Sequence, residues 1–541
     1  MRFIIHTFLL PLLLPWSTLA QPATLLTDLN PAAAHTFPEG VFYGKPVHLL
    51  AFGDKILFVA DDGIHGAEPW ISDGTPAGAA LLKDIKPGAG SSYISGFTEF
   101  EGRIYFSADD GAAGQELWVT DGTESGTTLF KDLRSGPGSS NPRGLTVAGD
   151  LLFCSADKSG AEPALWQSDG TDAGTVVTPG LIFSILGPSQ LTALNGKLYF
   201  AGPDRELWTT DGSVAGTFRV KEISPNESDS YIEHMVALDG KLYFSADDHP
   251  FNSEPWVSDG TEAGTFRLRE IEPGTTYGSN PRKFHFFKDK VFFAAGGLLW
   301  ATDGTQDGTD LFKNITVFQA SNDPATFLTR GDYLYFPADD GVHGRELWRT
   351  DGTPAGTVLV KDINNNFFDS APEELTAAGD GLFWFRAYTG NGDWELWRSD
   401  GSAAGTVRAA DLRPGAEGSY PQALTPWNGA LLFVADDGVH GRELWKLDLV
   451  TGTTSLLWRN DLFSCSPNPA DETLHIGLSP AATEEECSLR LFNSAGQTVF
   501  ASEKLSAGSV TIPATHLPAG VYSALLVSAG TAQSSRVVVA H

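Results

Sequence analysis

Short apolar runs separated by polar, glycine-rich turns recur along most of the chain. In one copy the apolar run Leu334–Phe336 is followed by the acidic turn Ala338–Gly341 and then by a second apolar run, Glu346–Thr350. The turn Asp351–Thr357 comes next, and a third run, Val358–Ile363, ends the unit. The runs are β-branched or aromatic and are bounded by Asp-Gly turns, which predicts antiparallel β-strands. No segment keeps a 3.6-residue apolar period, so we expect few helices.

This unit occurs nine times, and its central tryptophan marks each copy. Neighbouring copies lie 42–49 residues apart, and the tryptophans are Trp70, Trp118, Trp166, Trp208, Trp256, Trp300, Trp348, Trp397 and Trp445. A weaker fourth strand precedes the first run, as at Ala423–Thr425 in the ninth unit. Four strands in about 48 residues is the size of a propeller blade. We therefore predict an all-β fold whose main part is a β-propeller of about nine four-stranded blades. Two smaller propellers and an open β-solenoid are the alternatives.

Two segments compete to supply the outer strand of the last blade. Thr24–Leu29 resembles the outer strand Leu81–Ile85, so the N-terminal segment could complete the ninth blade and close the ring. The ninth unit also has an apolar run of its own at Thr454–Trp458. The sequence leaves both possibilities open.

The repeat ends near Ser464, and a different pattern follows. Alternating strands are predicted at Ser488–Phe492, Gly508–Ile512 and Val521–Val527, which favours a small antiparallel β-sandwich. The predicted organisation is therefore a signal peptide at residues 1–20, a repeat propeller at 21–463 and a C-terminal domain at 464–541.

The N-terminal twenty residues have the pattern of a secretory signal peptide. Arg2 precedes the apolar run Phe8–Leu14, and small residues stand at the predicted cleavage site Thr18–Ala20. The run is too short to span a membrane, and no later stretch is long and apolar enough to do so. We expect export through the periplasm to the outside of the cell or to the outer-membrane surface.

Three cysteines fit an exported chain. Cys154 lies within an apolar strand and is expected in the core. Cys465 and Cys487 flank the start of the last domain and could pair in an oxidising compartment.

The negative charge of the chain disfavours some classes of binding partner and suggests calcium as a cofactor. The chain has 67 acidic and 36 basic residues, a net charge of −31, which disfavours nucleic acid and anionic membranes. Acidic turns bring paired carboxylates beside a glutamate in four units, and hard oxygen ligands suit calcium. The calcium candidates are Asp61, Asp62, Glu68, Asp109, Asp110, Glu116, Asp339, Asp340, Glu346, Asp436, Asp437 and Glu443. The alternative is that these residues only build solvated turns.

No motif in the sequence indicates a catalytic centre. There is no His-Glu-x-x-His, Cys-x-x-Cys or Gly-x-Ser-x-Gly, and the aspartates of the Asp-Gly-Thr turns recur too often to form one active site. Three histidines share one turn position and are expected at the surface: His65, His343 and His440. The units that break the pattern are the best places to seek a site. They are the fourth with Gly202–Arg205, the sixth with Gly296 and Gly297, and the eighth with Arg386, Tyr388, Asn391, Asp393 and Trp394.

The repeats resemble the ELWxxDGT repeat proteins. Glu116–Thr123 and Glu346–Thr353 spell that consensus, and the resemblance covers the nine units. The family implies an architecture and no enzymatic activity.

The tail resembles the type A C-terminal sorting domain of the type IX secretion system. Pro467–Pro469, Leu491–Gly496 with Val499, and Leu517–Tyr522 match its pattern in order and spacing. The resemblance implies that residues 464–541 contact the type IX machinery and direct passage across the outer membrane of Bacteroidota-type bacteria.

These observations support three hypotheses of function. The first is a non-catalytic binding propeller that presents loops to a glycan, an extracellular protein or a matrix component. The second is a polysaccharide hydrolase or lyase, and the third is a structural envelope component. Exposed aromatic side chains would favour glycan binding, whereas a clustered acid pair with Arg or Tyr would favour the enzyme.

Overall fold

The computed structural model describes most of the repeat region and the strands of the tail. The described residues are 23–31, 36, 49–160, 162–183, 187–225, 229–249, 252–273, 278–317, 327–365, 368–379, 381–390, 392–415, 417–449, 457–458, 463–466, 473–478, 487–492, 498–505, 509–513, 515, 517, 520–528 and 531–539. The predicted signal peptide and Asn391 lie outside them. By its contacts the chain divides into two units, Met1–Leu449 and Val450–His541.

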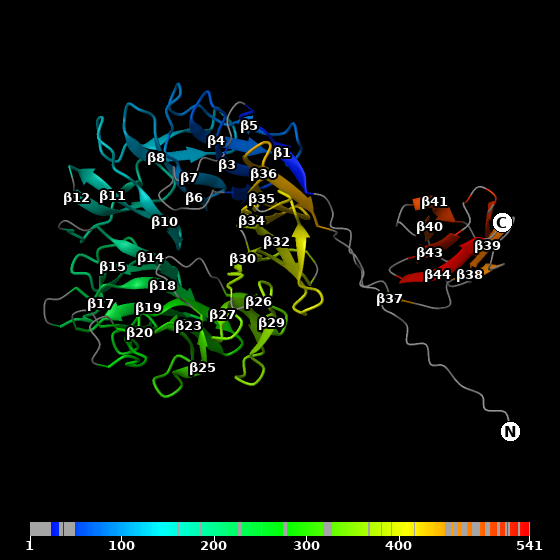
Figure 1. The fold of residues 1–541 in the computed structure, drawn as a ribbon. Coiled ribbons are helices and arrows are strands. Elements are labelled where there is room, and N and C mark those ends of the chain that lie inside the picture. The colour runs from blue at the N-terminus through cyan, green and yellow to red at the C-terminus, as the bar shows by residue number, and fades with distance from the viewer. Residues whose placement is uncertain are drawn as a thin grey trace. The chain divides into compact units, whose positions relative to one another are not determined.

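The first unit is a propeller whose nine blades each have four antiparallel strands (Figure 1). The innermost strands are β2 (Leu49–Phe52), β6 (Ser95–Phe100), β10 (Arg143–Ala148), β14 (Ser189–Leu194), β18 (Glu233–Leu238), β22 (Arg282–Phe287), β26 (Leu328–Arg330), β30 (Glu373–Ala377) and β34 (Gln422–Trp427). The second strands are β3 (Lys55–Asp61), β7 (Arg103–Asp109), β11 (Leu151–Ser159), β15 (Lys197–Ala201), β19 (Lys241–Asp247), β23 (Lys290–Ala295), β27 (Tyr333–Asp339), β31 (Phe383–Tyr388) and β35 (Ala430–Asp436).

The third strands carry the repeat tryptophans, and the fourth strands form the outer rim. The third strands are β4 (Ala67–Ser72), β8 (Gln115–Thr120), β12 (Glu162–Ser168), β16 (Leu207–Thr210), β20 (Ser253–Ser258), β24 (Leu298–Thr302), β28 (Arg345–Thr350), β32 (Trp394–Ser399) and β36 (Arg442–Asp448). The fourth strands are β5 (Ala80–Leu81), β9 (Thr128–Lys131), β13 (Val176–Val177), β17 (Phe218–Lys221), β21 (Phe266–Arg267), β25 (Asp310–Thr316), β29 (Val358–Lys361) and β33 (Val407–Ala410), with β1 (Thr24–Thr27) in the ninth blade. One residue pair, Thr316 with Asp339, joins the sheets of the sixth and seventh blades.

The N-terminal strand closes the ring. β1 pairs antiparallel with β36, with Leu25 opposite Trp445, and so supplies the outer strand of the ninth blade. The competing segment is used elsewhere, because Leu457 and Trp458 form β37, which pairs with a strand of the C-terminal unit. Side chains of the ninth and first blades also share one buried cluster that includes Trp427 and Phe58.

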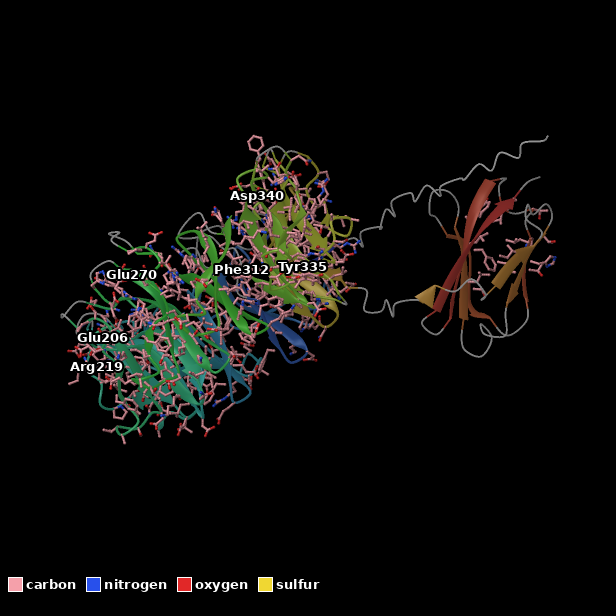
Figure 2. All side chains as sticks on the ribbon, turned by 90° about the horizontal axis from the view of Figure 1, so that it is seen from below. Glu206, Arg219, Glu270, Phe312, Tyr335 and Asp340 are labelled. Carbon is pink, nitrogen blue, oxygen red and sulfur yellow. The ribbon has the colours of Figure 1, made fainter. Side chains whose placement is uncertain are left out.

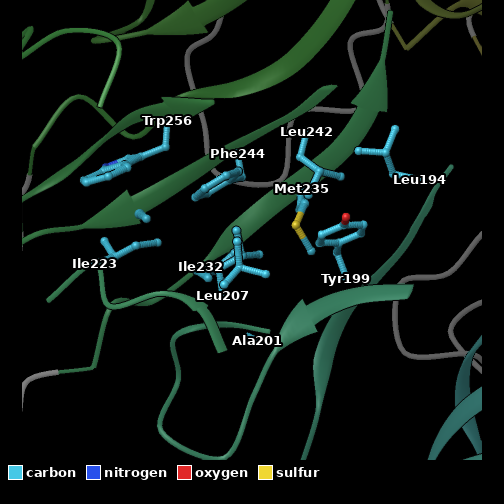
Figure 3. Packing of buried hydrophobic residues seen from close by; sticks show 12 residues of the cluster. Leu194, Tyr199, Ala201, Leu207, Ile223, Ile232, Met235, Leu242, Phe244 and Trp256 are labelled. Atoms are coloured by element: carbon cyan, nitrogen blue, oxygen red, sulfur yellow. The ribbon is translucent and has the colours of Figure 1, made fainter. Parts of the chain in front are cut away.

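Hydrophobic side chains fill the space between neighbouring blades. Between the fourth and fifth blades, the cluster contains Tyr199, Leu207, Phe244 and Trp256, all buried (Figure 3). Each blade is therefore apolar on both faces, which explains why its middle strands are continuous apolar runs and do not alternate. Cys154 is buried in such a cluster, as predicted.

The order of strands places two kinds of loop on one face of the ring. Neighbouring strands within a blade are antiparallel, so the hairpins from second to third strands and the connectors from fourth strands to the next innermost strands lie at the same end. We call this end the connector face. The Asp-Gly-Thr turns, which join third and fourth strands, lie at the opposite end.

The C-terminal unit contains two sheets. Its strands are β37 (Leu457–Trp458), β38 (Phe463–Ser466), β39 (Thr473–Leu478), β40 (Cys487–Phe492), β41 (Thr498–Leu505), β42 (Ser509–Pro513), β43 (Gly520–Ser528) and β44 (Thr531–Val539). The sheet orders are β37-β44-β43-β40-β41 and β38-β39-β42, which agrees with the predicted β-sandwich; the β37 and β44 pair is parallel. Cys465 lies on β38 and Cys487 on β40, in different sheets. The side chains of this pair lie outside the described residues, so their pairing stays a prediction.

Candidate functional site

The paired carboxylates of the acidic turns hold their own hairpins together. Asp61 Oδ1 accepts the Gly63 N–H at 2.8 Å, and Asp62 Oδ1 accepts the N–H groups of Ile64 and His65 at 2.9 and 2.8 Å. The same pattern recurs at Asp109 and Asp110, at Asp339 and Asp340 (Asp340 is marked in Figure 2), and at Asp436 and Asp437. These residues act as turn-capping groups on the connector face.

The glutamates proposed beside them are buried and bind the next connector. Glu116 accepts the Leu133 N–H at 2.7 Å, the Ser140 N–H at 2.8 Å and the Ser140 hydroxyl at 2.6 Å. We call this arrangement the glutamate clasp. Glu68, Glu346 and Glu443 are also fully buried and accept bonds from the equivalent connector positions. Burial raises the pKa of all four carboxyls, to about 7 for Glu68 and Glu346 and to about 8 for Glu443.

The arrangement of these acidic side chains can be compared with what a calcium site requires. Within the described ranges, no three His, Cys, Asp or Glu side chains are grouped so that they could hold a metal ion. The turn aspartates and clasp glutamates accept bonds from backbone N–H groups and from neighbouring side chains. Calcium binding at the twelve candidates stays a prediction, which a calcium titration of chelator-treated protein would test.

The three equivalent histidines each pair with an aspartate of their own turn. His65 Nδ1 lies 2.7 Å from Asp62 Oδ2, and His440 Nδ1 lies 2.7 Å from Asp437 Oδ2. His343 makes the same contact with Asp340 at 2.9 Å. The hydrogen bond to the carboxylate raises the pKa of each imidazole. These are separate surface pairs on three blades.

In the fourth and sixth units, which depart from the repeat, the hairpin between the second and third strands is short. In the fourth, Asp204 Oδ1 accepts the indole N–H of Trp208 at 2.6 Å, and Arg219 pairs with the other oxygen at 3.1 Å. Glu206 and Arg219 of this unit are marked in Figure 2. In the sixth, β23 and β24 are joined by Gly296 and Gly297.

The eighth unit forms a pocket with the connector that precedes it. The cavity of about 390 Å³ is lined by Phe368, Asp369, Ala371, Tyr388 and Trp394. Tyr388 ends β31 and Trp394 begins β32, whereas the other three residues lie between β29 and β30. Phe368 is 66 % exposed, and its ring is therefore open to solvent. The pocket thus lies on the connector face, between the seventh and eighth blades.

Polar contacts fix the aromatic wall of this pocket. The rings of Tyr388 and Trp394 are 5.7 Å apart, and the Arg386 guanidinium lies 5.3 Å from the Trp394 ring. Arg386 is held by a largely buried ion pair with Glu373. Asp393 accepts a bond from Arg408 at 3.2 Å, which orders the hairpin on its outer side. The wall is therefore preorganised, a property that favours binding.

One carboxylate faces the pocket. Asp369 Oδ1 accepts the Arg345 N–H at 2.8 Å, which fixes the side chain, and the carboxylate is exposed. Sequence reasoning singled out Tyr388 and Trp394, because their unit departs from the repeat. It missed Phe368, Asp369 and Ala371, which belong to the preceding connector. A signal was available, since alanine replaces the tyrosine or asparagine found before most other innermost strands.

Comparison with protein families identifies the tail. Residues 464–540 match the family model of the secretion system C-terminal sorting domain. This match confirms the type IX sorting domain that the sequence predicts, and with it export to the cell surface or the medium. In the described part of the chain, no helix is long and apolar enough to cross a membrane.

Comparison with solved structures finds distant likenesses. A prolyl endopeptidase is 11% identical with a TM-score of 0.36, over 72% of this chain and 54% of that one. A puromycin hydrolase is 12% identical with a TM-score of 0.36, over 75% and 60%. An extracellular domain assigned to a hybrid two-component system of B. thetaiotaomicron is 11% identical with a TM-score of 0.30, over 91% and 74%. No curated protein matches the chain. These likenesses are too distant to indicate a function.

Proposed function

We propose that the protein is an exported binding propeller that holds a glycan in the pocket between the seventh and eighth blades. The observation that carries this proposal is the pocket lining, three aromatic rings and one carboxylate on the surface. Aromatic faces stack on the apolar faces of sugar rings, and a fixed carboxylate can accept bonds from sugar hydroxyls. The volume of about 390 Å³ is in the range of small-ligand sites.

The same pocket gives less support to an enzyme. Glycoside hydrolysis uses two carboxyl groups that flank the scissile bond. Among the residues that line the pocket, Asp369 is the one carboxylate. Glu373 is nearby but is paired with Arg386. Binding therefore fits the geometry better than hydrolysis does.

The test measures retention and products together. The full exported chain is incubated with soluble β-1,3-glucan, xylan and chitosan, and both bound protein and released fragments are measured. We expect Asp369→Asn and Trp394→Ala to weaken retention by about tenfold or more, which corresponds to the loss of one aromatic or charged contact. Phe218→Ala, which removes a half-exposed ring from the outer strand β17, is the matched control and should bind normally.

Two results would count against this proposal. Unchanged retention by both pocket variants would remove the pocket as the binding site. Release of fragments by the unmodified protein that Asp369→Asn abolishes would establish a hydrolase or lyase in place of a binding protein.

A further inference from the structure

Three tyrosines occupy one equivalent position on the connector face. Tyr93, Tyr231 and Tyr420 each stand two residues before an innermost strand, namely β6, β18 and β34. Their positions are therefore where a connector reaches the centre of the ring, and Figure 1 shows these strands around that centre. The same position holds Asn141 and Asn280 in two other units, and Ala371 in the pocket.

The backbone at this position is left-handed in every one of these units. The φ angles are 49° at Tyr93, 43° at Tyr231 and 47° at Tyr420, and they are 49° and 47° at Asn141 and Asn280. Asparagine tolerates this region because its short side chain bonds locally, whereas a bulky side chain is strained there. The tyrosines therefore occupy a conformation that asparagine would adopt with less strain.

Burial does not offset the strain at the tyrosines. Tyr93, Tyr231 and Tyr420 are 48, 54 and 42% exposed. Half-exposed rings recover little of the free energy that an aromatic side chain gains in a core. Strain that folding does not compensate is typical of residues kept for binding.

One of the three adjoins the proposed pocket. The Tyr420 N–H donates to the carbonyl of Trp394 at 3.1 Å, so the connector of Tyr420 runs directly beside the pocket wall. At Tyr93, the Lys86 ammonium lies 5.2 Å from the ring and is also bonded to Asp109, while the Tyr93 carbonyl accepts a bond from Gln115. The Gln115 bond fixes the Tyr93 backbone, and the Lys86 contact leaves the ring 48% exposed.

We propose that these tyrosines are stacking platforms for a polysaccharide chain that extends across the connector face beyond the pocket. This inference rests on the proposed glycan-binding function and adds the size and charge of the ligand. Separate stacking sites on one rigid ring raise the affinity for a long polysaccharide. Once one site has bound the polysaccharide, binding at each further site takes place within the same complex. The protein has a net charge of −31, which repels polyanions. We therefore expect the polysaccharide ligand to be uncharged or cationic.

The experiment replaces the three tyrosines by the residue that the protein itself uses. The triple variant Tyr93→Asn, Tyr231→Asn, Tyr420→Asn is compared with the unmodified full chain. Binding is measured to β-1,3-glucan and to chitosan, each as the polymer and as the hexamer. Alginate is the polyanionic control, and a proline-rich peptide is the control for a protein ligand. We expect the triple variant to melt at the same temperature or higher, because asparagine relieves the strain. We expect it to bind the polymer at least about tenfold more weakly and to lose much less affinity for the hexamer, which the pocket holds.

The outcomes separate this inference from the pocket proposal. Normal polymer binding by the triple variant would overturn the role of the tyrosines, even if Trp394→Ala still abolishes hexamer binding. Normal hexamer binding by Trp394→Ala and Asp369→Asn would overturn the pocket. Tighter binding of alginate than of the uncharged and cationic polymers, or retention of the peptide alone, would overturn the ligand class proposed here.

Discussion

The clasp glutamates join seven of the nine blades to the segment that lies between that blade and the next one around the ring. Seven units carry one, at Glu68, Glu116, Glu206, Glu254, Glu346, Glu395 and Glu443, and all seven are buried. In the third and sixth units, Ala164 and Leu298 occupy the same sheet position. Burying a carboxylate is costly unless its oxygens accept hydrogen bonds. The clasp glutamates accept backbone and hydroxyl bonds, and among the described residues only Glu443 keeps one buried oxygen, Oε2, without a partner.

The raised pKa values predict that stability falls as the pH rises. Burial raises the pKa of Glu68, Glu206, Glu346 and Glu395 from 4.5 to about 7, and that of Glu443 to about 8. Between pH 4.5 and pH 8 these carboxyls hold more protons in the folded chain than in the unfolded chain. The free energy of unfolding therefore decreases as the pH rises through this range. The Asp-Gly-Thr aspartates have lowered pKa values, and their contribution is lost only in more acidic solution. Thermal unfolding followed by tryptophan fluorescence should show a lower melting temperature at pH 8 than at pH 5.

A single substitution checks that the clasp causes this slope. All partners of Glu346 are donors, including the Ile363 N–H at 2.7 Å and the Ser370 hydroxyl at 2.6 Å. Glu346→Gln would place an amide donor against them, and should cost about 1–3 kcal/mol and reduce the pH dependence by the share of one carboxyl. Glu101→Gln, on an exposed turn, is the control. A melting temperature that rises between pH 5 and 8 would contradict this explanation.

The Asp-Gly-Thr hairpin is the most regular element of the repeat. In the second blade Asp121 Oδ1 accepts the N–H and the hydroxyl of Thr123 at 2.9 and 2.6 Å, and the Thr123 hydroxyl accepts the Gly126 N–H at 3.0 Å. The Thr127 hydroxyl then bonds to the Thr123 carbonyl at 2.7 Å. All these partners lie within seven residues, so the sequence alone sets the hairpin.

Gly126 is predicted to be intolerant of any side chain. A Cβ at Gly126 would lie 2.0 Å from Asp121 Oδ1, so Gly126→Ala should displace the aspartate and destabilise the protein by about 1–2 kcal/mol. In an Asp121→Ala background the same change should cost much less, because the clashing group is gone. Gly90→Ala is the control, since its nearest neighbour is the flexible Lys86 chain at 3.4 Å. Equal costs of Gly126→Ala in both backgrounds, measured by chemical denaturation, would rule out the steric cause.

Elements that depend on neighbours in sequence could be predicted, whereas contacts between segments could not. The strand order and the turn role of Asp121 can be predicted from the pattern of a single unit, and the number of blades from how often that unit recurs. The clasp role of Glu116 did not, because Ser140 lies 24 residues away on a connector whose path is not encoded locally. For the same reason the pocket was only half predicted. Its hairpin departs from the repeat, but Phe368 comes from the connector between the seventh and eighth blades.

At the scale of the whole molecule, one short N-terminal segment completes both the sheet and the clasp of the ninth blade. β1 pairs with β36, and farther along the segment Thr36 donates its N–H and hydroxyl to Glu443. The Asp61 N–H in turn donates to the Thr36 carbonyl, as the Asp109 N–H does to that of Ser92. Thr36 therefore occupies the place that serine has in other connectors.

The hydroxyl at position 36 is predicted to matter more than the rest of its side chain. Thr36→Val removes a donor to the buried Glu443, so it should destabilise the protein by about 1–3 kcal/mol. Thr36→Ser keeps the donor and matches the other units, and should be close to neutral. Deletion of residues 21–36 should lower the melting temperature further and make the ninth blade the first site of limited proteolysis. Equal stability of the valine and serine variants would show that the clasp of this blade contributes nothing to closure.

The closing contact also has a consequence for folding. Thr36 and Glu443 are 407 residues apart, so the entropy of closing this loop is lost only when nearly the whole repeat region is organised. Contacts of such high sequence separation form slowly, and we expect ring closure to be the last step of folding. Until β1 arrives, the ninth blade presents the unpaired edge of β36, where another chain could add a strand. The time that the chain spends as an open ring therefore sets its exposure to aggregation.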